Sequence, residues 1–102
     1  MNMREIQRMQ QEMQRKLAKM QEELEATQFI GTAGGGAVTI TMSGKFEITA
    51  VKIDPEAFNA EDITELEVMV LAATRDAFNK VSEAQQKLVS SATGGMRIPG
   101  LF

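Results

Sequence analysis

Apolar residues recur every three or four positions through the first part of the chain, between residues 3 and 24. They are Met3, Ile6, Met13, Leu17, Met20 and Leu24. This is the a/d pattern of a heptad repeat, interrupted by Gln10 at an a position, and it predicts one long amphipathic helix. Because an apolar stripe at helical spacing is normally a core or coiled-coil contact, we assign it to packing and not to ligand binding.

The opposite side of this predicted helix is basic. At ~100° per residue, four cations fall within an arc of roughly 60°. They are Arg4, Arg8, Arg15 and Lys19. Arg4 with Arg8, and Arg15 with Lys19, are like charges four residues apart, which weaken a helix rather than stabilise it. An anionic partner would explain their presence, and an ordinary solvated helix face is the alternative.

Apolar and polar positions alternate in the next part of the chain, which predicts strands. The apolar side chains of the clearest strand, Val38, Ile40 and Met42, alternate with Thr39, Thr41 and Ser43. In the following strand the alternation changes phase before Val51, which predicts a β-bulge or a strong twist. Asp54-Pro55 ends the sheet, because proline cannot donate a ladder hydrogen bond. The pattern predicts a three-stranded antiparallel meander over residues 27–33, 37–43 and 46–53.

Three glycines, Gly34 to Gly36, separate the first two predicted strands. Glycine readily adopts positive φ, so we interpret the triplet as a turn. A phosphate-binding loop is the functional alternative. It would need a following Gly-Lys-Ser/Thr and a helix that begins after the glycines, and the sequence has neither.

A second long helix is predicted from about Glu61 to Ser90. One apolar stripe comprises Leu66, Val70, Ala73, Ala77, Val81, Ala84 and Leu88, and a second comprises Val68, Leu71, Phe78 and Val89. The two stripes lie roughly 100–120° apart around the helix. A chain of this size offers few layers to cover both, so we expect a homodimer.

The length of 102 residues allows one domain, and we expect it to comprise residues 1–92. Gly94-Gly95 and Pro99 stop the second helix, so residues 93–102 are expected to form a tail. The apolar residues of that tail could remain disordered or could dock on a partner subunit.

The residue inventory disfavours catalysis. The chain has no Cys, His, Trp or Tyr, which excludes thiol and imidazole chemistry and zinc sites built from Cys and His. The remaining Ser, Thr, Lys, Asp and Glu form no recognisable catalytic arrangement, so we expect no enzyme, no cofactor and no small-molecule substrate. No apolar run is long enough to span a membrane and no signal peptide is recognisable, so a cytoplasmic protein is expected.

The charge is unevenly distributed along the chain. The net charge is −3, whereas residues 1–20 carry +3, residues 21–62 carry −6 and residues 63–102 are neutral. An acidic protein is not a typical nucleic-acid binder. A polarised charge distribution can still steer an anion to its basic end.

The order of these elements, together with several short motifs, resembles the YbaB/EbfC family of bacterial nucleoid-associated proteins. The similar segments cover nearly the whole chain. They are Met9-Gln10-Gln11-Glu12-Met13-Gln14, Gly34-Gly35-Gly36, Val38 to Met42, Ser43-Gly44, Val51-Lys52-Ile53-Asp54-Pro55, Ala72-Ala73 to Asp76-Ala77, Gly94-Gly95 and Ile98-Pro99-Gly100.

The resemblance implies an α+β fold, an intertwined homodimer, and binding of double-stranded DNA in the nucleoid with little sequence preference. Carried over by position, the DNA-binding residues would be Arg4, Arg8, Arg15, Lys19, Arg75 and Lys80. Relatives often have Asn at the position of Arg75, and some have a longer N-terminus. The alternative function is a protein-interaction or scaffold module that uses the apolar stripes or the Leu101-Phe102 tail.

Overall fold

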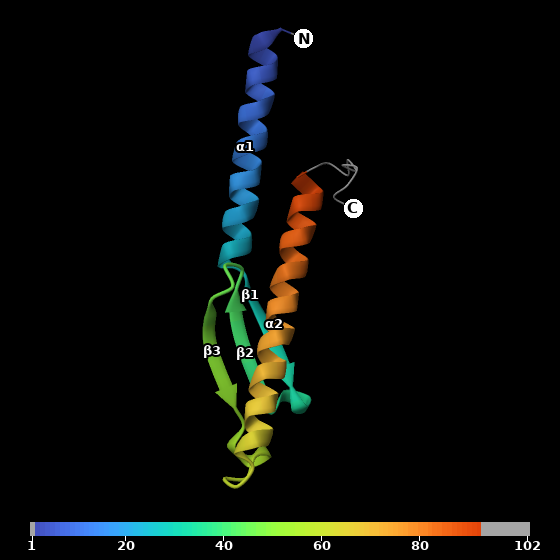
Figure 1. Ribbon diagram of the computed structural model, residues 1–102. Coiled ribbons are helices and arrows are strands. Elements are labelled where there is room, and N and C mark those ends of the chain that lie inside the picture. The colour runs from blue at the N-terminus through green and yellow to red at the C-terminus, as the bar shows by residue number, and fades with distance from the viewer. Residues whose placement is uncertain (1, 93–102) are drawn as a thin grey trace.

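The protein is an α+β fold in which a small sheet lies between two long helices in the sequence. The computed structural model describes residues 2–92, so the predicted tail lies outside the described residues. The elements are α1 (Met3–Ala26), β1 (Gln28–Ala33), β2 (Val38–Ser43), β3 (Ile48–Ile53) and α2 (Ile63–Ala92), with short 3-10 segments at Gly34–Gly36 and Pro55–Ala57. Helix α2 lies along the sheet, and α1 projects from one end as an arm (Figure 1). The predicted order of helix, three strands and helix is confirmed.

Both ends of α1 are fixed by side-chain capping. Asn2 is the N-cap, and its Oδ1 accepts a hydrogen bond of 2.9 Å from the backbone N–H of Glu5. At the other end, the hydroxyl of Thr27 donates to the carbonyl oxygen of Glu23 at 2.7 Å. These contacts satisfy backbone groups that a helix end leaves unpaired. The helix therefore begins at the predicted residue and continues two residues beyond Leu24.

The sheet is an antiparallel meander in the order β1-β2-β3, as predicted. Its register is irregular between Thr41 and Met42, where Thr41 pairs with Ala50 and Met42 with Ile48. This irregularity confirms the predicted bulge. The prediction that β3 begins at Phe46 is wrong, because Phe46 lies in the turn with φ 63° and its N–H donates to the carbonyl of Ser43 at 3.0 Å.

The glycine triplet forms a turn, as predicted, and its three residues have φ values of 64°, 68° and 97°. The second helix begins at Ile63, two residues later than predicted. Glu61 and Asp62 therefore precede the helix, and Glu65 is the acidic residue of its first turn.

The core lies between α2 and the middle strand. Val38, Ile40 and Met42 of β2 are buried against Ala73, Ala77 and Val81 of α2. The alanines let the helix approach β1 so closely that a Cβ on Gly31 would overlap the backbone of Ala73 and Ala77. The first apolar stripe predicted for α2 therefore faces the sheet, and the helix covers β1 and β2.

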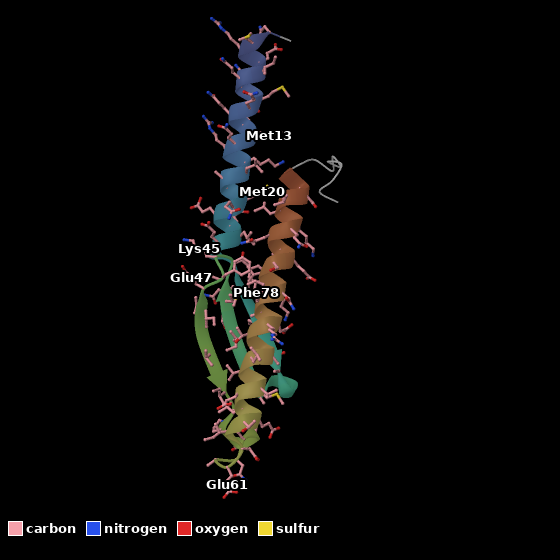
Figure 2. The ribbon with its side chains drawn as sticks, in the orientation of Figure 1. Met13, Met20, Lys45, Glu47, Glu61 and Phe78 are labelled. Carbon is pink, nitrogen blue, oxygen red and sulfur yellow. The ribbon has the colours of Figure 1, made fainter. Side chains whose placement is uncertain are left out.

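The inner side of β3 is left uncovered by α2. Val51 and Ile53 pair with Ile40 and Val38, so they lie on the same side of the sheet as the core. Nevertheless they are 53% and 39% exposed. The second stripe of α2 is also exposed, and Phe78 contacts Phe46 just before β3, with ring centroids 4.8 Å apart. We call Ile48, Val51, Ile53, Val68, Leu71 and Phe78 the uncovered face (Figure 2 labels Phe78).

Side chains on the opposite side of α2 form hydrogen bonds with the free edge of β1. The backbone N–H of Thr32 donates to Oδ2 of Asp76 at 2.9 Å, and Nζ of Lys80 donates to the carbonyl oxygen of Ile30 at 2.6 Å. Lys80 and Asp76 also form an ion pair at 3.4 Å. The Thr32 hydrogen bond, aided by Lys80, lowers the pKa of Asp76 below 3.8. These contacts occupy edge groups that would otherwise be available to another strand.

The close approach of α2 to β1 predicts the effect of two glycine substitutions. Gly31→Ala places a Cβ against helix backbone, which cannot move aside as a side chain can. We expect this overpacking to lower the free energy of unfolding by about 1–3 kcal/mol or more. Gly35→Ala is the control, because a Cβ there meets no atom within 4 Å and the residue has only its positive φ to strain it. We expect the control substitution to lower the free energy of unfolding by about 1 kcal/mol. Urea denaturation would measure both free energies of unfolding. Equal decreases for the two variants would contradict the close packing of α2 on Gly31.

The Asp76 contacts predict a pH-dependent contribution to stability. A carboxylate whose pKa is lowered by folding stabilises the protein above its unfolded pKa, and this contribution is lost as the pH falls through the folded value. We therefore expect Asp76→Asn to be less stable than wild type at pH 7, and the difference to shrink as the pH falls below the ordinary pKa of 3.8 and to vanish below the lowered pKa of the folded protein. Thermal unfolding of both proteins across this range tests it, and a pH-independent difference would contradict the role of the charge.

Candidate nucleic-acid interface

The predicted cations of α1 form one exposed line along a continuous helix. Arg4, Arg8, Arg15 and Lys19 are all exposed, and no break interrupts the helix between them. We call these four residues the basic stripe. At ~1.5 Å per residue, the stripe is about 22 Å long.

The basic stripe faces away from the rest of the molecule. Leu17, Met20 and Leu24, on the other side of α1, are half-buried toward α2. Cations on the opposite side of the same helix therefore point into solvent. Figure 2 shows α1 standing clear of the sheet over most of its length, with Met20 level with the last turns of α2 and Met13 beyond them.

The cations of the stripe form no ion pair within residues 2–92. Among residues 2–92, the ion pairs are Lys45 with Glu25 at 4.0 Å and Lys80 with Asp76 at 3.4 Å, and neither involves the stripe. Exposed, unpaired cations are available to an anionic partner. Lys16 is also exposed, but it lies ~100° around the helix from Arg15 and outside the stripe.

The other two predicted DNA-binding residues do not extend this surface in a single chain. Arg75 is exposed on α2, roughly 160° around the helix from the buried Ala77 and so on the side away from the sheet. Lys80 is occupied by Asp76 and the Ile30 carbonyl. The sequence contained no sign of this role, because Lys80 and Ile30 are 50 residues apart.

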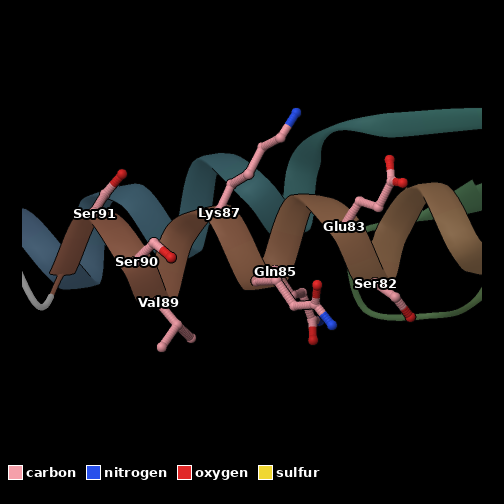
Figure 3. A pocket seen from close by; sticks show the side chains of 8 residues that line it. Ser82, Glu83, Gln85, Lys87, Val89, Ser90 and Ser91 are labelled. Carbon is pink, nitrogen blue, oxygen red and sulfur yellow. The ribbon is translucent and has the colours of Figure 1, made fainter. Parts of the chain in front are cut away.

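A hollow lies near the end of α2 (Figure 3). Its lining comes from α2 alone, and consists of Ser82, Glu83, Gln85, Gln86, Lys87, Val89, Ser90 and Ser91. Side chains spread around one helix do not converge on a bound molecule as those of an enclosed pocket do. Within the described part of the chain, no group of three His, Cys, Asp or Glu residues is placed to hold a metal ion.

A helix that spans a bilayer needs about 20 consecutive, predominantly apolar residues. None of the helices in residues 2–92 is long and apolar enough to cross a membrane.

Comparison with known proteins gives relatives that match all or most of the chain. A nucleoid-associated protein of Chloroflexus aurantiacus is 41% identical over 102 residues and covers all of both chains. One from Dictyoglomus turgidum is 47% identical over 91 residues, 88% of each chain. One from Clostridium acetobutylicum is 40% identical over 100 residues, which are 98% of this chain and 89% of that one.

A solved structure supports the fold, and a family model gives the classification. The crystal structure of an uncharacterized protein from Helicobacter pylori matches with a TM-score of 0.72 at 21% identity, covering 89% of this chain and 96% of that one. The model of the YbaB/EbfC DNA-binding family matches residues 1–96. With the relatives at about 40% identity, this match confirms the resemblance recognised in the sequence, and the chain belongs to the YbaB/EbfC DNA-binding family.

Proposed function

We propose that this protein binds double-stranded DNA in the cytoplasmic nucleoid as a homodimer, with low sequence specificity. The observation that carries the proposal is the basic stripe of α1, whose four cations are exposed, aligned and unpaired by acidic side chains. The relatives' description as nucleoid-associated proteins agrees with this location.

The chemistry of the stripe favours contact with phosphates over reading of bases. Arg and Lys side chains supply affinity by displacing counterions from the DNA backbone, and such contacts orient a duplex without identifying its sequence. The stripe is long enough, at ~22 Å, to reach several phosphates along one strand. We assign the main contact to Arg4, Arg8, Arg15 and Lys19. Arg75 is a secondary candidate, and a contact by Lys80 would require it to leave Asp76.

The uncovered face supports the homodimer. Its two parts meet at the contact between Phe78 of α2 and Phe46 just before β3, and their side chains are mostly about half exposed in the single chain. A contiguous apolar surface of this kind marks an interaction site. A second copy related by a two-fold axis would cover the same surface on both chains at once. Two stripes, one from each copy, would then be presented to one duplex.

The proposed DNA contact predicts the behaviour of the double variant Arg8→Gln with Arg15→Gln. Glutamine is a good helix former, and one like charge is removed from each pair, so folding should be unaffected or slightly improved. We expect DNA affinity to fall. Because each lost phosphate contact flattens the slope of log affinity against log salt by ~0.9, a dimer that loses four charges should lose up to ~3–4 units of slope. Mobility-shift titrations of a long duplex at several salt concentrations measure this.

The matched control is Lys45→Gln with Lys52→Gln, which removes the same charge from the sheet region. Lys45 already faces Glu25 at 4.0 Å, and eight acidic residues lie in the segment 21–62. We expect this variant to keep nearly all of its affinity and slope. If instead the α1 variant binds like wild type, the basic stripe is an ordinary solvated face, and the protein-interaction function becomes the better explanation.

The proposed interface predicts the mass of the protein in solution. Light scattering should give about twice the chain mass of 11.2 kDa at micromolar concentration. Leu71→Glu places a charge on the uncovered face, and we expect a folded monomer because the leucine is already 52% exposed in the single chain. Ile30→Glu is the control, because Ile30 is equally exposed at 52% but pairs with Thr41 on the outer side of the sheet. A wild-type monomer would refute the homodimer, and a Leu71→Glu dimer would refute this interface.

A further inference from the structure

The apolar stripe of α1 is covered along only about the last third of its length. Leu17, Met20 and Leu24 are half-buried, whereas the residues nearer the N-terminus are exposed. We call those exposed residues the arm seam, and they are Met3 at 74%, Ile6 at 44%, Met9 at 56% and Met13 at 59%. The arm seam continues the same side of the helix that packs toward α2.

The change from covered to exposed coincides with the end of α2. Gln85 of α2 donates through Nε2 to the carbonyl oxygen of Gly44 at 3.1 Å, and Gly44 lies directly against Leu24 of α1. Gln85 and Leu24 are therefore nearly level. Both helices rise ~1.5 Å per residue in opposite chain directions, so Ala92 is about level with Leu17. Figure 1 shows α1 continuing well beyond the end of α2.

The segment that follows α2 has the length and the side chains to cover the arm seam. Residues 93–102, which lie outside the described residues, follow Ala92 in the sequence, and they include Met96, Ile98, Leu101 and Phe102. Ten extended residues span up to ~33 Å, and the distance along α1 from Leu17 to Met3 is ~21 Å. Gly94, Gly95 and Pro99 disfavour a continued helix and so favour an extended segment.

We propose that residues 93–102 bind the arm seam of α1 in the same chain. The segment starts beside its site, so a short tether gives it a high effective concentration there, which a separate molecule lacks. Burial of apolar side chains on both partners drives the contact. The arm seam and the basic stripe lie on opposite sides of α1, so the bound segment leaves the stripe exposed. This inference goes beyond DNA binding and holds whether or not the protein binds DNA.

Disulfide trapping tests the position of the segment, because the natural chain has no cysteine. Met9→Cys with Leu101→Cys places one thiol in the arm seam and one in the segment. The control is Gln11→Cys with Leu101→Cys, since Gln11 is only ~3 Å from Met9 along α1 but faces ~160° away from it. Under mild oxidation we expect the Met9 pair to close within one chain about tenfold faster than the Gln11 pair, or more.

Non-reducing gels and mass spectrometry separate the outcomes. Equal closure rates for the two pairs would mean that the segment has no preference for the arm seam, and would overturn the proposal. A covalent dimer formed through Met9 and Leu101 would also overturn it, since the segment would then occupy the arm of a second copy. Intrachain closure through Met9 at the faster rate supports it.

Methyl NMR provides a second test that needs no new thiols. In Leu101→Ser with Phe102→Ser, we expect the methyl resonances of Met9 and Met13 to shift relative to wild type. Met69 is the internal control, because it packs beside Gly34, far from the arm, and should not shift. Unchanged Met9 and Met13 resonances would overturn the proposal. DNA affinity of this variant should match wild type, so failure of the DNA-binding proposal is distinguishable.

Discussion

The close packing of α2 on two strands of the sheet is the constraint on which the rest of the structure depends. Ala73 and Ala77 lie so close to Gly31 that no side chain fits at residue 31 between helix and strand. Val38 and Ile40 are buried against the same face of the helix. One helix is too narrow to cover three strands at this distance. Because Asp76 and Lys80 hydrogen-bond to β1 and hold α2 on that side of the sheet, the strand left uncovered is β3.

This packing also determines what α1 can do. The turn after β2 contacts α1 at Leu24, through Gly44. Most of α1 therefore extends beyond the sheet and the core as an arm. The arm has one apolar side and one basic side, so packing contacts and contacts with an anionic partner can use different sides of the same helix. The apolar side serves packing within the protein, and the basic side is free for an anionic partner. The overall charge of −3 therefore says little about binding, because the acidic residues lie mainly in the middle of the chain.

Features that depend on local periodicity could be predicted from the sequence. These include the helices, the buried side of β2, the bulge before Val51, the glycine turn and the exposed second stripe of α2. Features that depend on distant contacts could not. Nothing near Asp76 in the sequence indicates that it caps the edge of β1, 44 residues away, or that Lys80 is held there with it. The apolar and polar alternation predicted that Phe46 belongs to β3. In the structure Phe46 has a positive φ, lies in the turn before β3 and contacts Phe78, which alternation alone does not indicate.

The most direct test of the central claim is photo-crosslinking from two neighbouring positions of α1. Gln10 and Gln11 are the same residue type and both are exposed, but Gln10 lies on the apolar side and Gln11 borders the basic stripe. A photoreactive residue at each position in turn, irradiated with a duplex at low salt, reports which side of the helix contacts DNA. We predict strong crosslinking from position 11 and little from position 10. Equal crosslinking from both, or more from position 10, would contradict the assignment of DNA binding to the basic stripe.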